Sequence, residues 1–487
     1  MSKAHLEQTE ISLLLARLKW PLPGPKWWAM QELADLLANS YYQSQVEELL
    51  RSELMNCGFE TEVVELLFVF WMAQFRGYVA QPVLPNYVRA RSVLSSMLLY
   101  EITPEASSKG ELSSPLLLAP QGFSPDDDFN AAQGHEVPRI FIHELNRLEE
   151  MSRFPFLAQY AFEWARSLVR VPPRGHSIDY FLRGSQDGMT GQFVTQNSHR
   201  GRSAYLRTIL VAKEFWDMPD SWVTQSSLLA LPINPTLASM RSSKPPWLND
   251  LGFPGPVTRE SIEAFIRNTI YSCNQRSEII LAALSFPIQF SENEIIDLNL
   301  TLWVQWRNVD VDVATLLSED HSGYDWEILE SEGLSNWFTF KAKVIEELCD
   351  AAFYSAPVAG SLFRFRYGYL QTDIYSRGWY VPLCTRSAVT AQPSSNKLKF
   401  VRDEIDLGET GYWNAGWAPC HPKDCGPFCG TYLILNKKHL PSFWDEPPTN
   451  YFYLWECKKI RREQSYREYE IERYKGFIRY NMTNGKS

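Results

Sequence analysis

A chain of 487 residues with 45% hydrophobic and 21% charged residues is long enough for two or three domains and too apolar to be disordered. The formal net charge of −10 argues against a protein coated in nucleic acid, although it leaves room for a local basic channel. The most apolar run, residues 66–73, is much shorter than the ~20 residues of a membrane-spanning helix, and no secretory signal pattern begins the chain. The eight cysteines are spread thinly, unlike a disulfide framework, so we expect a cytoplasmic protein without membrane contact.

Residues 11–102 are predicted to be helical, because apolar side chains recur at helical spacing and proline pairs separate the segments. One apolar stripe is formed by Trp27, Met30, Ala34 and Leu37. Residues 46–54 repeat this arrangement, and residues 61–75 are apolar nearly all round, which predicts a central buried helix. The sequence therefore predicts an array of antiparallel helices joined by short turns, the architecture of helical-repeat proteins.

Four motifs lie in this segment: Trp20-Pro21, WWAMQELA at residues 27–34, ETEVVEL at residues 60–66 and SVLS at residues 92–95. They resemble the HEAT-type helical regions of large bacterial antiphage proteins, notably STAND NTPases. The resemblance covers about the first hundred residues and includes no catalytic residue. Because the chain lacks the phosphate loop G-x-x-x-x-G-K-S/T of those NTPases, the resemblance implies only a sensing or scaffolding role beside a separate enzyme.

Residues 104–137 are rich in Pro, Ser, Gly and Asp and are predicted to be a linker or a long loop. Asp126, Asp127 and Asp128 could bind a cation through adjacent carboxylates. A solvated acidic loop is the favoured interpretation, because the alternating positions of a calcium loop are missing. Helices are predicted to resume at residues 139–148 and 156–169.

Residues 184–202 are polar, rich in glycine and without a hydrophobic period, which predicts a loop before a helix that starts at Ser203 and is ended by Pro219. His199, Arg200 and Arg202 in this loop could hold an anion beside the free backbone N–H groups of the helix. We favour a surface connector with solvated arginines, because no phosphate-loop spacing accompanies the glycines. A second helix is predicted over residues 220–231.

The hydrophobic period changes beyond a helix that Thr258 can cap, because apolar and polar side chains alternate in residues 296–306 as in a half-buried strand. Further strands are predicted at residues 309–313, 362–369, 379–383, 398–402, 431–435 and 451–456. Helices are predicted at residues 339–352 and 461–478, the second from interleaved Glu and Arg side chains. In residues 363–369 aromatic side chains alternate with arginines, which could bind nucleic acid, although an aromatic core side with a charged outer side is the favoured interpretation.

Three thiols and an imidazole lie within ten residues: Cys420, His421, Cys425 and Cys429. Zinc prefers four such ligands in a tetrahedron, and the fourth ligand could be His421, His439, Cys384 or Cys457. The C-x4-C-x3-C spacing is not that of a standard zinc knuckle, so a cysteine-rich turn with free thiols is the favoured alternative. A bound zinc ion would be structural, because no clear general base lies nearby.

A second candidate site consists of Asp445 and the motif Glu456-Cys457-Lys458 that follows an apolar strand, an arrangement that resembles PD-(D/E)xK nucleases. In such an enzyme Asp445 and Glu456 would hold a magnesium ion, and Lys458 would orient the attacking water. The alternative is a strand whose charged side chains lead into a salt-bridged helix. We favour this alternative, because three-residue motifs often match by chance.

We therefore expect an α+β multidomain protein in four segments: a HEAT-like helical-repeat domain (1–103), a linker (104–137), a helical middle domain (138–275) and a C-terminal mixed β-sheet domain (276–487). The expected function is that of a non-catalytic sensor or adaptor in a bacterial antiphage defence assembly, which binds another protein subunit through its helical array. The alternative function is a metal-dependent nuclease with its active site in the C-terminal domain.

Overall fold

The structure is a computed structural model, and it divides the chain into two compact units. The helical unit comprises Met1–Asn234 with Phe363–Thr372, and the sheet unit comprises Pro235–Leu362 with Asp373–Ser487. The residues that it describes are 3–106, 110–125, 129–130, 139–167, 195–233, 235–248, 256–275, 278–291, 294–305, 339–340, 353–354, 356–357, 369–370, 380–381, 389–394, 396–402, 404–414, 429–443, 450–462 and 469–480.

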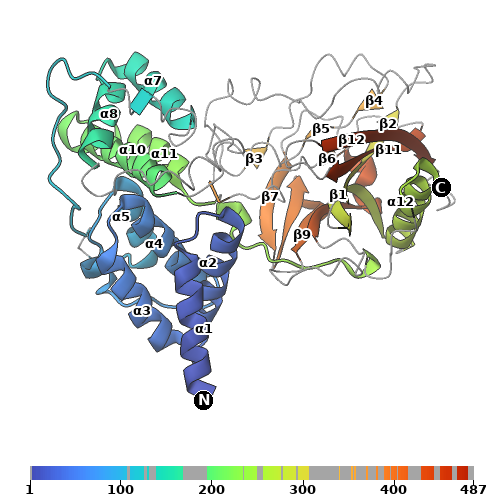
Figure 1. The fold of residues 1–487 in the computed structure, drawn as a ribbon, viewed down its shortest axis with the longest axis horizontal. Coiled ribbons are helices and arrows are strands. Elements are labelled where there is room, and N and C mark those ends of the chain that lie inside the picture. Colours follow the sequence, from blue (N-terminus) through green and yellow to red (C-terminus); the bar gives the residue numbers. More distant parts are fainter. Residues whose placement is uncertain are drawn as a thin grey trace. The chain divides into compact units, whose positions relative to one another are not determined.

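The described part of the helical unit consists of helices joined by turns and coil segments (Figure 1). Its elements are α1 (Lys3–Arg17), α2 (Pro23–Ala38), α3 (Gln43–Asn56), α4 (Glu60–Gln74), η1 (Leu84–Tyr87), α5 (Val93–Ile102), α7 (Arg139–Ser152), α8 (Phe156–Arg166), α10 (Gln196–Phe215), α11 (Asp220–Ser227) and η4 (Leu228–Ala230).

Helix α4 is the centre of this unit and packs against α2, α3, α5 and α10. Its side chains are buried on nearly every side, so the predicted central buried helix is confirmed. The helix begins after Phe59, where the Glu62 carboxylate accepts hydrogen bonds from the backbone N–H groups of Gly58 and Phe59 at 2.9 and 3.0 Å. These bonds satisfy N–H groups that have no partner within the helix.

Helix α10 starts earlier than the sequence predicts. Its N-cap is Thr195, whose side chain accepts a hydrogen bond from the backbone N–H of Ser198 at 3.1 Å. Residues 196–202 are therefore helical, and the prediction of a loop up to residue 202 is wrong for them. The reason is that the buried side of this first part carries polar side chains paired with other helices, so it shows no hydrophobic period. Residues 184–194 lie outside the described residues.

The sheet unit combines antiparallel strands with one α-helix among its described residues, so the α+β class is confirmed. Its described elements are η5 (Pro235–Leu237), η6 (Pro246–Leu248), α12 (Arg259–Asn274), β1 (Ile279–Ser291), β2 (Glu294–Gln305), β3 (Thr339–Phe340), β4 (Phe353–Tyr354), β5 (Ala356–Pro357), β6 (Tyr380–Val381), β7 (Val389–Ser394), β8 (Lys397–Arg402), β9 (Ile405–Asn414), β10 (Cys429–Asn436), η8 (Lys437–Phe443), β11 (Asn450–Arg462) and β12 (Tyr469–Tyr480).

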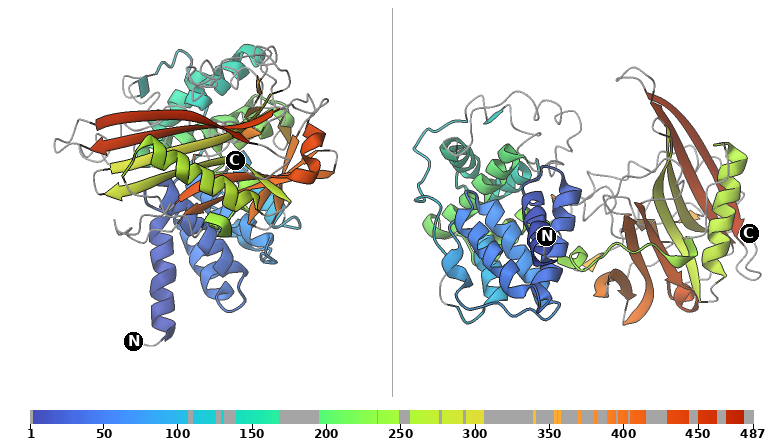
Figure 2. Two further views of the ribbon diagram at one scale, coloured as in Figure 1. Left: turned by 90° about the vertical axis from the view of Figure 1, so that its right-hand side faces the viewer. Right: turned by 60° about the horizontal axis from the view of Figure 1, so that its bottom comes forward.

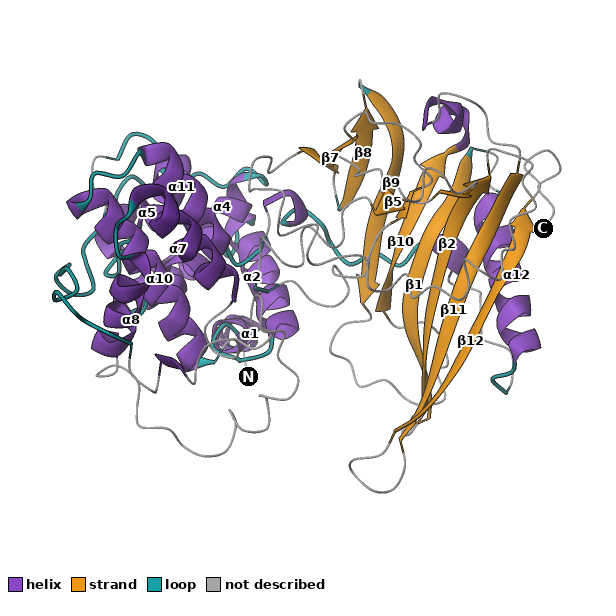
Figure 3. Cartoon of the chain, turned by 90° about the horizontal axis from the view of Figure 1, so that it is seen from above, coloured by secondary structure: helices purple, strands orange, loops and turns teal. Residues whose placement is uncertain are grey.

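The main sheet has the strand order β12-β11-β2-β1-β10-β9-β8-β7-β3, with β4 paired to the end of β2. The strands from β12 to β7 are labelled in Figure 3. Every described pairing is antiparallel, whereas a mixed sheet was expected. Short connections such as those between β1 and β2 or between β8 and β9 explain this, because parallel neighbours need long crossovers. The strands predicted at residues 296–306, 398–402, 431–435 and 451–456 are confirmed as β2, β8, β10 and β11.

Helix α12 lies along one face of this sheet (Figure 2) and packs against β1. Thr258 caps it as predicted, since its side chain accepts a hydrogen bond from the Ser261 N–H. At the other end of the helix the Asn274 side-chain oxygen accepts from the Leu281 N–H at 2.9 Å, and the Tyr453 hydroxyl donates to the Leu281 carbonyl at 2.8 Å. These bonds join α12, β1 and β11 across the buried face of the sheet.

The helix predicted at residues 461–478 is wrong, because the described residues of this segment are the end of β11 and most of β12. Its interleaved charges pair across strands, as in the Lys459–Glu472 ion pair at 3.0 Å, instead of along one helix. Thr339 and Phe340, predicted to begin a helix, form the short strand β3. Residues 309–313, 341–352 and 362–368 of the remaining predictions lie outside the described residues.

The unit boundary differs from the expected segments. Residues 235–275 belong to the sheet unit and not to a helical middle domain. Part of the expected linker is held to the helical unit, where the Gln159 side chain accepts from the Ala119 N–H at 2.8 Å and donates to the Leu117 carbonyl at 2.9 Å. Residues 369–370 also belong to the helical unit, and the Leu370 N–H donates to the Pro232 carbonyl at 2.8 Å.

Candidate functional site

Helix α10 brings polar side chains into the interior of the helical unit. His199, Ser203 and Arg207 follow one another by about one helical turn and therefore share a face, and Arg202 lies beside them. All four side chains are buried. The Ser203 hydroxyl accepts a hydrogen bond from the Thr61 N–H of α4 at 3.1 Å, which shows that this face is turned toward the central helix.

The first buried group on this face, which we name the Lys26–Glu65 cluster, consists of Lys26, Glu65, His199, Arg202 and Tyr369. The Lys26 ammonium lies 2.7 Å from Glu65 Oε2 and 3.2 Å from His199 Nε2. The Tyr369 hydroxyl donates to Glu65 Oε1 at 2.7 Å, and the Arg202 guanidinium lies 4.0 Å above the Tyr369 ring. The cluster therefore joins α2, α4, α10 and Tyr369, which come from distant parts of the sequence.

Burial governs the protonation of this cluster. It lowers the pKa of Lys26 and raises the pKa of Glu65, while the attraction between the two groups opposes both shifts. Burial, with the nearby charges of Lys26 and Arg202, holds the pKa of His199 well below its usual 6.5. The imidazole is therefore neutral, and its Nε2 accepts from the Lys26 ammonium. Among the described residues, His199 Nδ1 has no hydrogen-bond partner.

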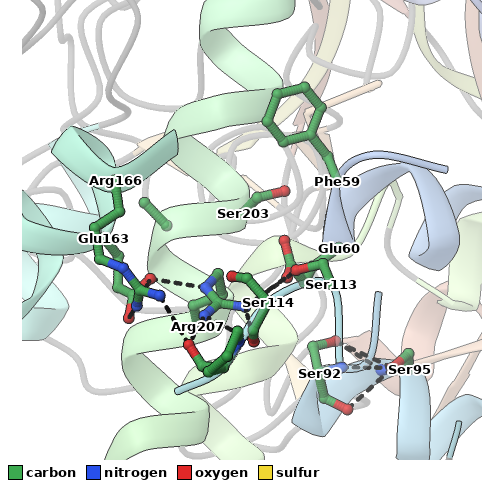
Figure 4. Close-up of polar contacts among 12 residues, drawn as sticks. Phe59, Glu60, Ser92, Ser95, Ser113, Ser114, Glu163, Arg166, Ser203 and Arg207 are labelled. Carbon is green, nitrogen blue, oxygen red and sulfur yellow. Dashed lines mark hydrogen bonds and ion pairs between the residues drawn. The ribbon is translucent and has the colours of Figure 1, made fainter. Parts of the chain in front are cut away.

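A second buried group surrounds Arg207 (Figure 4). Its Nε lies 2.7 Å from Glu163 Oε2 of α8, and its Nη1 lies 3.1 Å from Glu60 Oε1 of α4. The same guanidinium donates to the Ser113 hydroxyl at 3.1 Å and to the Pro115 carbonyl at 3.2 Å. One cation thus links two helices and the coil segment that crosses them, which explains why this part of the expected linker is ordered.

Both buried groups are internal contacts, and neither presents a reactive atom at the surface. A catalytic group has to reach its substrate, but the side chains of Lys26 and Glu65 are 1% and 5% exposed. Arg207, Glu60 and Glu163 are equally buried. These groups are suited to hold distant segments in one packing arrangement, because a buried charge without its partner is strongly unfavourable.

The anion site considered for His199, Arg200 and Arg202 is not formed by a loop at a helix mouth, since the three residues lie within α10 and are buried. The favoured alternative, solvated arginines on a surface connector, is also wrong. Arg200 lies 3.8 Å from the Trp164 ring centre and donates to the Trp164 carbonyl at 2.9 Å. The arginines are therefore part of the packing between α10 and the rest of the helical unit.

The predicted zinc site lies mostly outside the described residues, as do Asp126, Asp127 and Asp128. Four of its candidate ligands are not described: Cys384, Cys420, His421 and Cys425. Cys429 begins β10, His439 lies in η8 and Cys457 lies within β11. Burial, with Asp297 and Glu456 nearby, raises the pKa of Cys457 to about 12, which disfavours the thiolate that zinc binds. The part of the chain that is described contains no group of three potential metal ligands, and the zinc site stays a prediction.

Two of the three predicted nuclease residues are described. Glu456 and Lys458 lie in the middle of β11 rather than at its end, and they share one face because they are two residues apart. Asp297 of β2 is the register partner of Lys458, so its side chain belongs to the same face. Asp445 lies outside the described residues.

The surroundings of Glu456 are basic. Arg473 Nη1 and Lys475 Nζ of β12 lie 3.8 and 3.9 Å from Glu456 Oε1. Asp297 is one of the polar residues that alternate with apolar residues in 296–306. This alternation predicts that its side chain lies on the face of the sheet opposite the apolar side chains. The alternation does not predict which strand pairs with it, so the sequence contains no local signal for the approach of Asp297 to Lys458.

Three exposed apolar side chains lie within or just after the helices α4 and α5. The Gln74 side chain donates to the Ile102 carbonyl at 3.0 Å and holds these two helix ends together. Phe75, Val79 and Tyr100, which we name the α4–α5 apolar end, are 71%, 79% and 69% exposed. Aromatic side chains are enriched in surfaces that bind another protein, so these three positions are candidates for such a surface.

No protein-family model matches the chain, and no curated protein matches it. Within the described residues, no helix combines the length and apolar character needed to span a membrane.

Proposed function

We propose that the protein is a non-catalytic sensor or adaptor that binds a protein partner through the α4–α5 apolar end of its helical unit. The observation that carries this proposal is the exposure of Phe75, Val79 and Tyr100 on one unit whose described buried charges are paired internally. Aromatic and aliphatic groups at an interface contribute through desolvation and need no preformed reaction centre. The surface therefore supports recognition and not chemistry.

The arrangement of the first helices supports a helical-repeat architecture for this unit. Each of α1 to α5 packs against its neighbour in the chain, and α2 also packs against α4. Stacking of successive helices with their neighbours is the pattern of HEAT-like arrays, whose exposed helix surfaces bind proteins. The bacterial antiphage context comes from the resemblance of the first hundred or so residues to HEAT-type regions.

Charge substitution at the α4–α5 apolar end tests the proposal. We expect Phe75→Asp, Val79→Asp and Tyr100→Asp each to lower the recovery of one specific partner about tenfold, because an aspartate at the centre of an apolar interface is desolvated without a counter-ion. The tagged protein is purified from bacteria that carry its gene, and co-purifying proteins are quantified by mass spectrometry.

A matched control is Tyr41→Asp, which changes an equally exposed aromatic side chain, 73% exposed, in the turn between α2 and α3. Melting temperatures establish that all variants fold. Recovery of the same proteins with wild type, control and the three variants would reject the α4–α5 apolar end as the binding surface.

A metal-dependent nuclease is the second candidate, and one observation favours it. Asp297, Glu456 and Lys458 share a sheet face, with Asp297 opposite Lys458, so two carboxylates and a lysine lie together even without Asp445. Two carboxylates could hold a magnesium ion, and the lysine could orient an attacking water. The ion pairs of Glu456 with Arg473 and Lys475 work against metal binding, which is why this function is second.

An endonuclease assay separates the two functions. The purified protein is incubated with duplex DNA, single-stranded DNA and RNA in magnesium, in manganese and in chelator. Under the nuclease hypothesis, cleavage requires metal and is abolished in Glu456→Ala and Lys458→Ala, and loss in either Asp297→Ala or Asp445→Ala identifies the other carboxylate. Glu472→Ala is the control, because this carboxylate lies on the opposite face of the sheet.

A further inference from the structure

The two ends of the main sheet differ in length. Among the described strands one end is β3, which has two residues, and the other is β12, which has 12. β12 pairs with β11 along its whole length without a register shift, from Tyr469 opposite Arg462 to Tyr480 opposite Tyr451. It contains no proline. A long regular edge strand presents a row of backbone N–H and C=O groups that can pair with another strand.

The side chains of β12 form an ordered pattern on one face. Ile471 and Phe477 are 52% and 38% exposed, and Arg473 and Lys475 lie between them at alternate positions. Because both cations approach Glu456 of β11, all four side chains belong to the face that carries Glu456. In chain order this face reads apolar, basic, basic, apolar.

We propose that β12 binds an extended segment of a partner protein as an added strand of the sheet. The segment has two acidic side chains, separated by one residue, opposite Arg473 and Lys475, and apolar side chains opposite Ile471 and Phe477. Backbone hydrogen bonds to the edge supply affinity, and the alternate side chains supply specificity, as in other complexes formed by strand addition.

The charges of Arg473 and Lys475 favour an acidic partner segment over a second copy of the chain. In an antiparallel pair of copies centred on Tyr474, Ile471 lies opposite Phe477, but Arg473 lies opposite Lys475, and this happens twice. Like charges directly opposite each other destabilise a strand pair, and basic residues on an edge strand oppose self-association. Among the described residues both cations share a single carboxylate, that of Glu456, so the edge retains positive charge for an acidic partner.

A peptide-binding experiment tests the proposal. The probe is a fluorescent peptide of sequence Thr-Val-Thr-Glu-Thr-Glu-Thr-Val-Thr, and the control peptide has Lys in place of both Glu. Fluorescence anisotropy with the full chain is expected to show that the acidic peptide binds at least about tenfold more tightly than the basic one, because each opposite-charge pair is replaced by a repulsive pair. Its affinity should also fall as salt is added.

Reversing the charges of Arg473 and Lys475 tests whether these two side chains determine which peptide the protein prefers. In the double variant Arg473→Glu with Lys475→Glu the preference should invert, so that the basic peptide now binds more tightly. The neutral double variant Arg473→Gln with Lys475→Gln should bind both peptides equally and covers the case in which the reversed variant does not fold. Glu470→Gln with Glu472→Gln alters the opposite face and should leave the preference unchanged.

Two outcomes overturn the proposal. One is equal affinity of the wild-type protein for the acidic and basic peptides, or no binding of either. The other is a dimer of the wild-type chain in sedimentation analysis that becomes monomeric in Ile471→Lys, since this would show that a second copy occupies the edge.

Discussion

The helical unit contains buried ion pairs besides exposed ones, whereas the described ion pairs of the sheet unit are all partly exposed. In the helical unit, the side chains of Arg207, Glu60 and Glu163 are 5%, 0% and 1% exposed, and both carboxylates pair with Arg207. In the sheet unit, the Arg473 side chain is 51% exposed and approaches a Glu456 side chain that is 21% exposed. Buried charges are unfavourable unless every partner is in place, whereas exposed pairs contribute little to stability.

The buried and the exposed ion pairs are therefore suited to different roles. The buried pairs of the helical unit select which distant segments pack together, because other arrangements would leave a charge without its partner. The exposed pairs of the sheet unit cost little to rearrange, so they are available to a partner's side chains. Substitutions that remove one member of a buried ion pair can be compared with substitutions that remove one member of an exposed ion pair. The difference between their effects on the free energy of unfolding tests this contrast between the units.

The largest effect is expected for Arg207→Met. Removing this guanidinium leaves the buried carboxylates of Glu60 and Glu163 without their shared cation, and we expect the free energy of unfolding to fall by about 3–5 kcal/mol. Urea unfolding followed by circular dichroism measures the change. Arg473→Met is the matched substitution in the sheet unit and should cost less than about 1 kcal/mol. Equal losses in the two variants would remove the distinction between the units.

In the sheet unit we expect a larger loss of stability from a steric clash within the apolar packing than from the removal of a charge. Gly476 is the position that tests this expectation. A Cβ atom added there would lie 2.5 Å from Cζ2 of the buried Trp455 ring on the neighbouring strand. We expect Gly476→Ala to lower the free energy of unfolding by about 1–3 kcal/mol, because the ring has to move out of its packing position. In the control Gly58→Ala the nearest atom is 3.9 Å away, and a similar loss there would refute the steric explanation.

A smaller loss is expected for Tyr369→Phe, which removes one hydroxyl from the Lys26–Glu65 cluster. The buried Glu65 carboxylate then lacks the donor that lies 2.7 Å from Oε1, and we expect a cost of about 1–3 kcal/mol in the free energy of unfolding. Tyr474→Phe removes a hydroxyl that donates to Glu472 on the sheet and should cost less than about 1 kcal/mol, because this hydroxyl is not in the protein interior. Thermal and urea unfolding of both variants make the comparison, and a neutral Tyr369→Phe would mean that the cluster does not stabilise the helical unit.

The smallest effect on stability is expected for a change of pH with the sequence unchanged. The pKa of His199 is held well below 6.5 in the folded chain, so below pH 6.5 the unfolded chain binds a proton that the folded chain excludes. The free energy of unfolding should therefore decrease as the pH falls from 6.5, by up to about 1.4 kcal/mol per pH unit. Glu65, whose pKa is raised, acts in the opposite direction above its usual 4.5.

The variant His199→Gln separates these two contributions. It should be less stable than wild type at pH 7 but should lose less stability on acidification to pH 5, because the histidine contribution is absent. Urea unfolding at several pH values provides the slopes. Identical slopes for the two proteins would contradict the neutral, buried imidazole.

Periodicity along the chain is sufficient to predict elements whose buried side is apolar. The stripe of Trp27, Met30, Ala34 and Leu37 predicts α2, and the alternation in residues 296–306 predicts β2. The same reasoning fails for the start of α10 and for β12. The buried face of α10 carries His199, Arg202 and Ser203, which a hydropathy pattern assigns to a loop. The Glu and Arg side chains of β12 satisfy helical spacing as well as alternation, so their spacing does not distinguish helix from strand.

The Lys26–Glu65 cluster could not be predicted from any local motif, because Lys26, Glu65, His199 and Tyr369 come from four distant segments. The same is true of the strand order that places Asp297 opposite Lys458 and leaves β12 at one end of the sheet. Composition and local period are sufficient for an α+β protein with helices first and strands later, since each residue's own hydropathy and neighbours determine its element. Which buried charges meet, and which of the described strands lies at the end of the sheet, depends on contacts between residues far apart in the chain, and these exist only once the chain has folded.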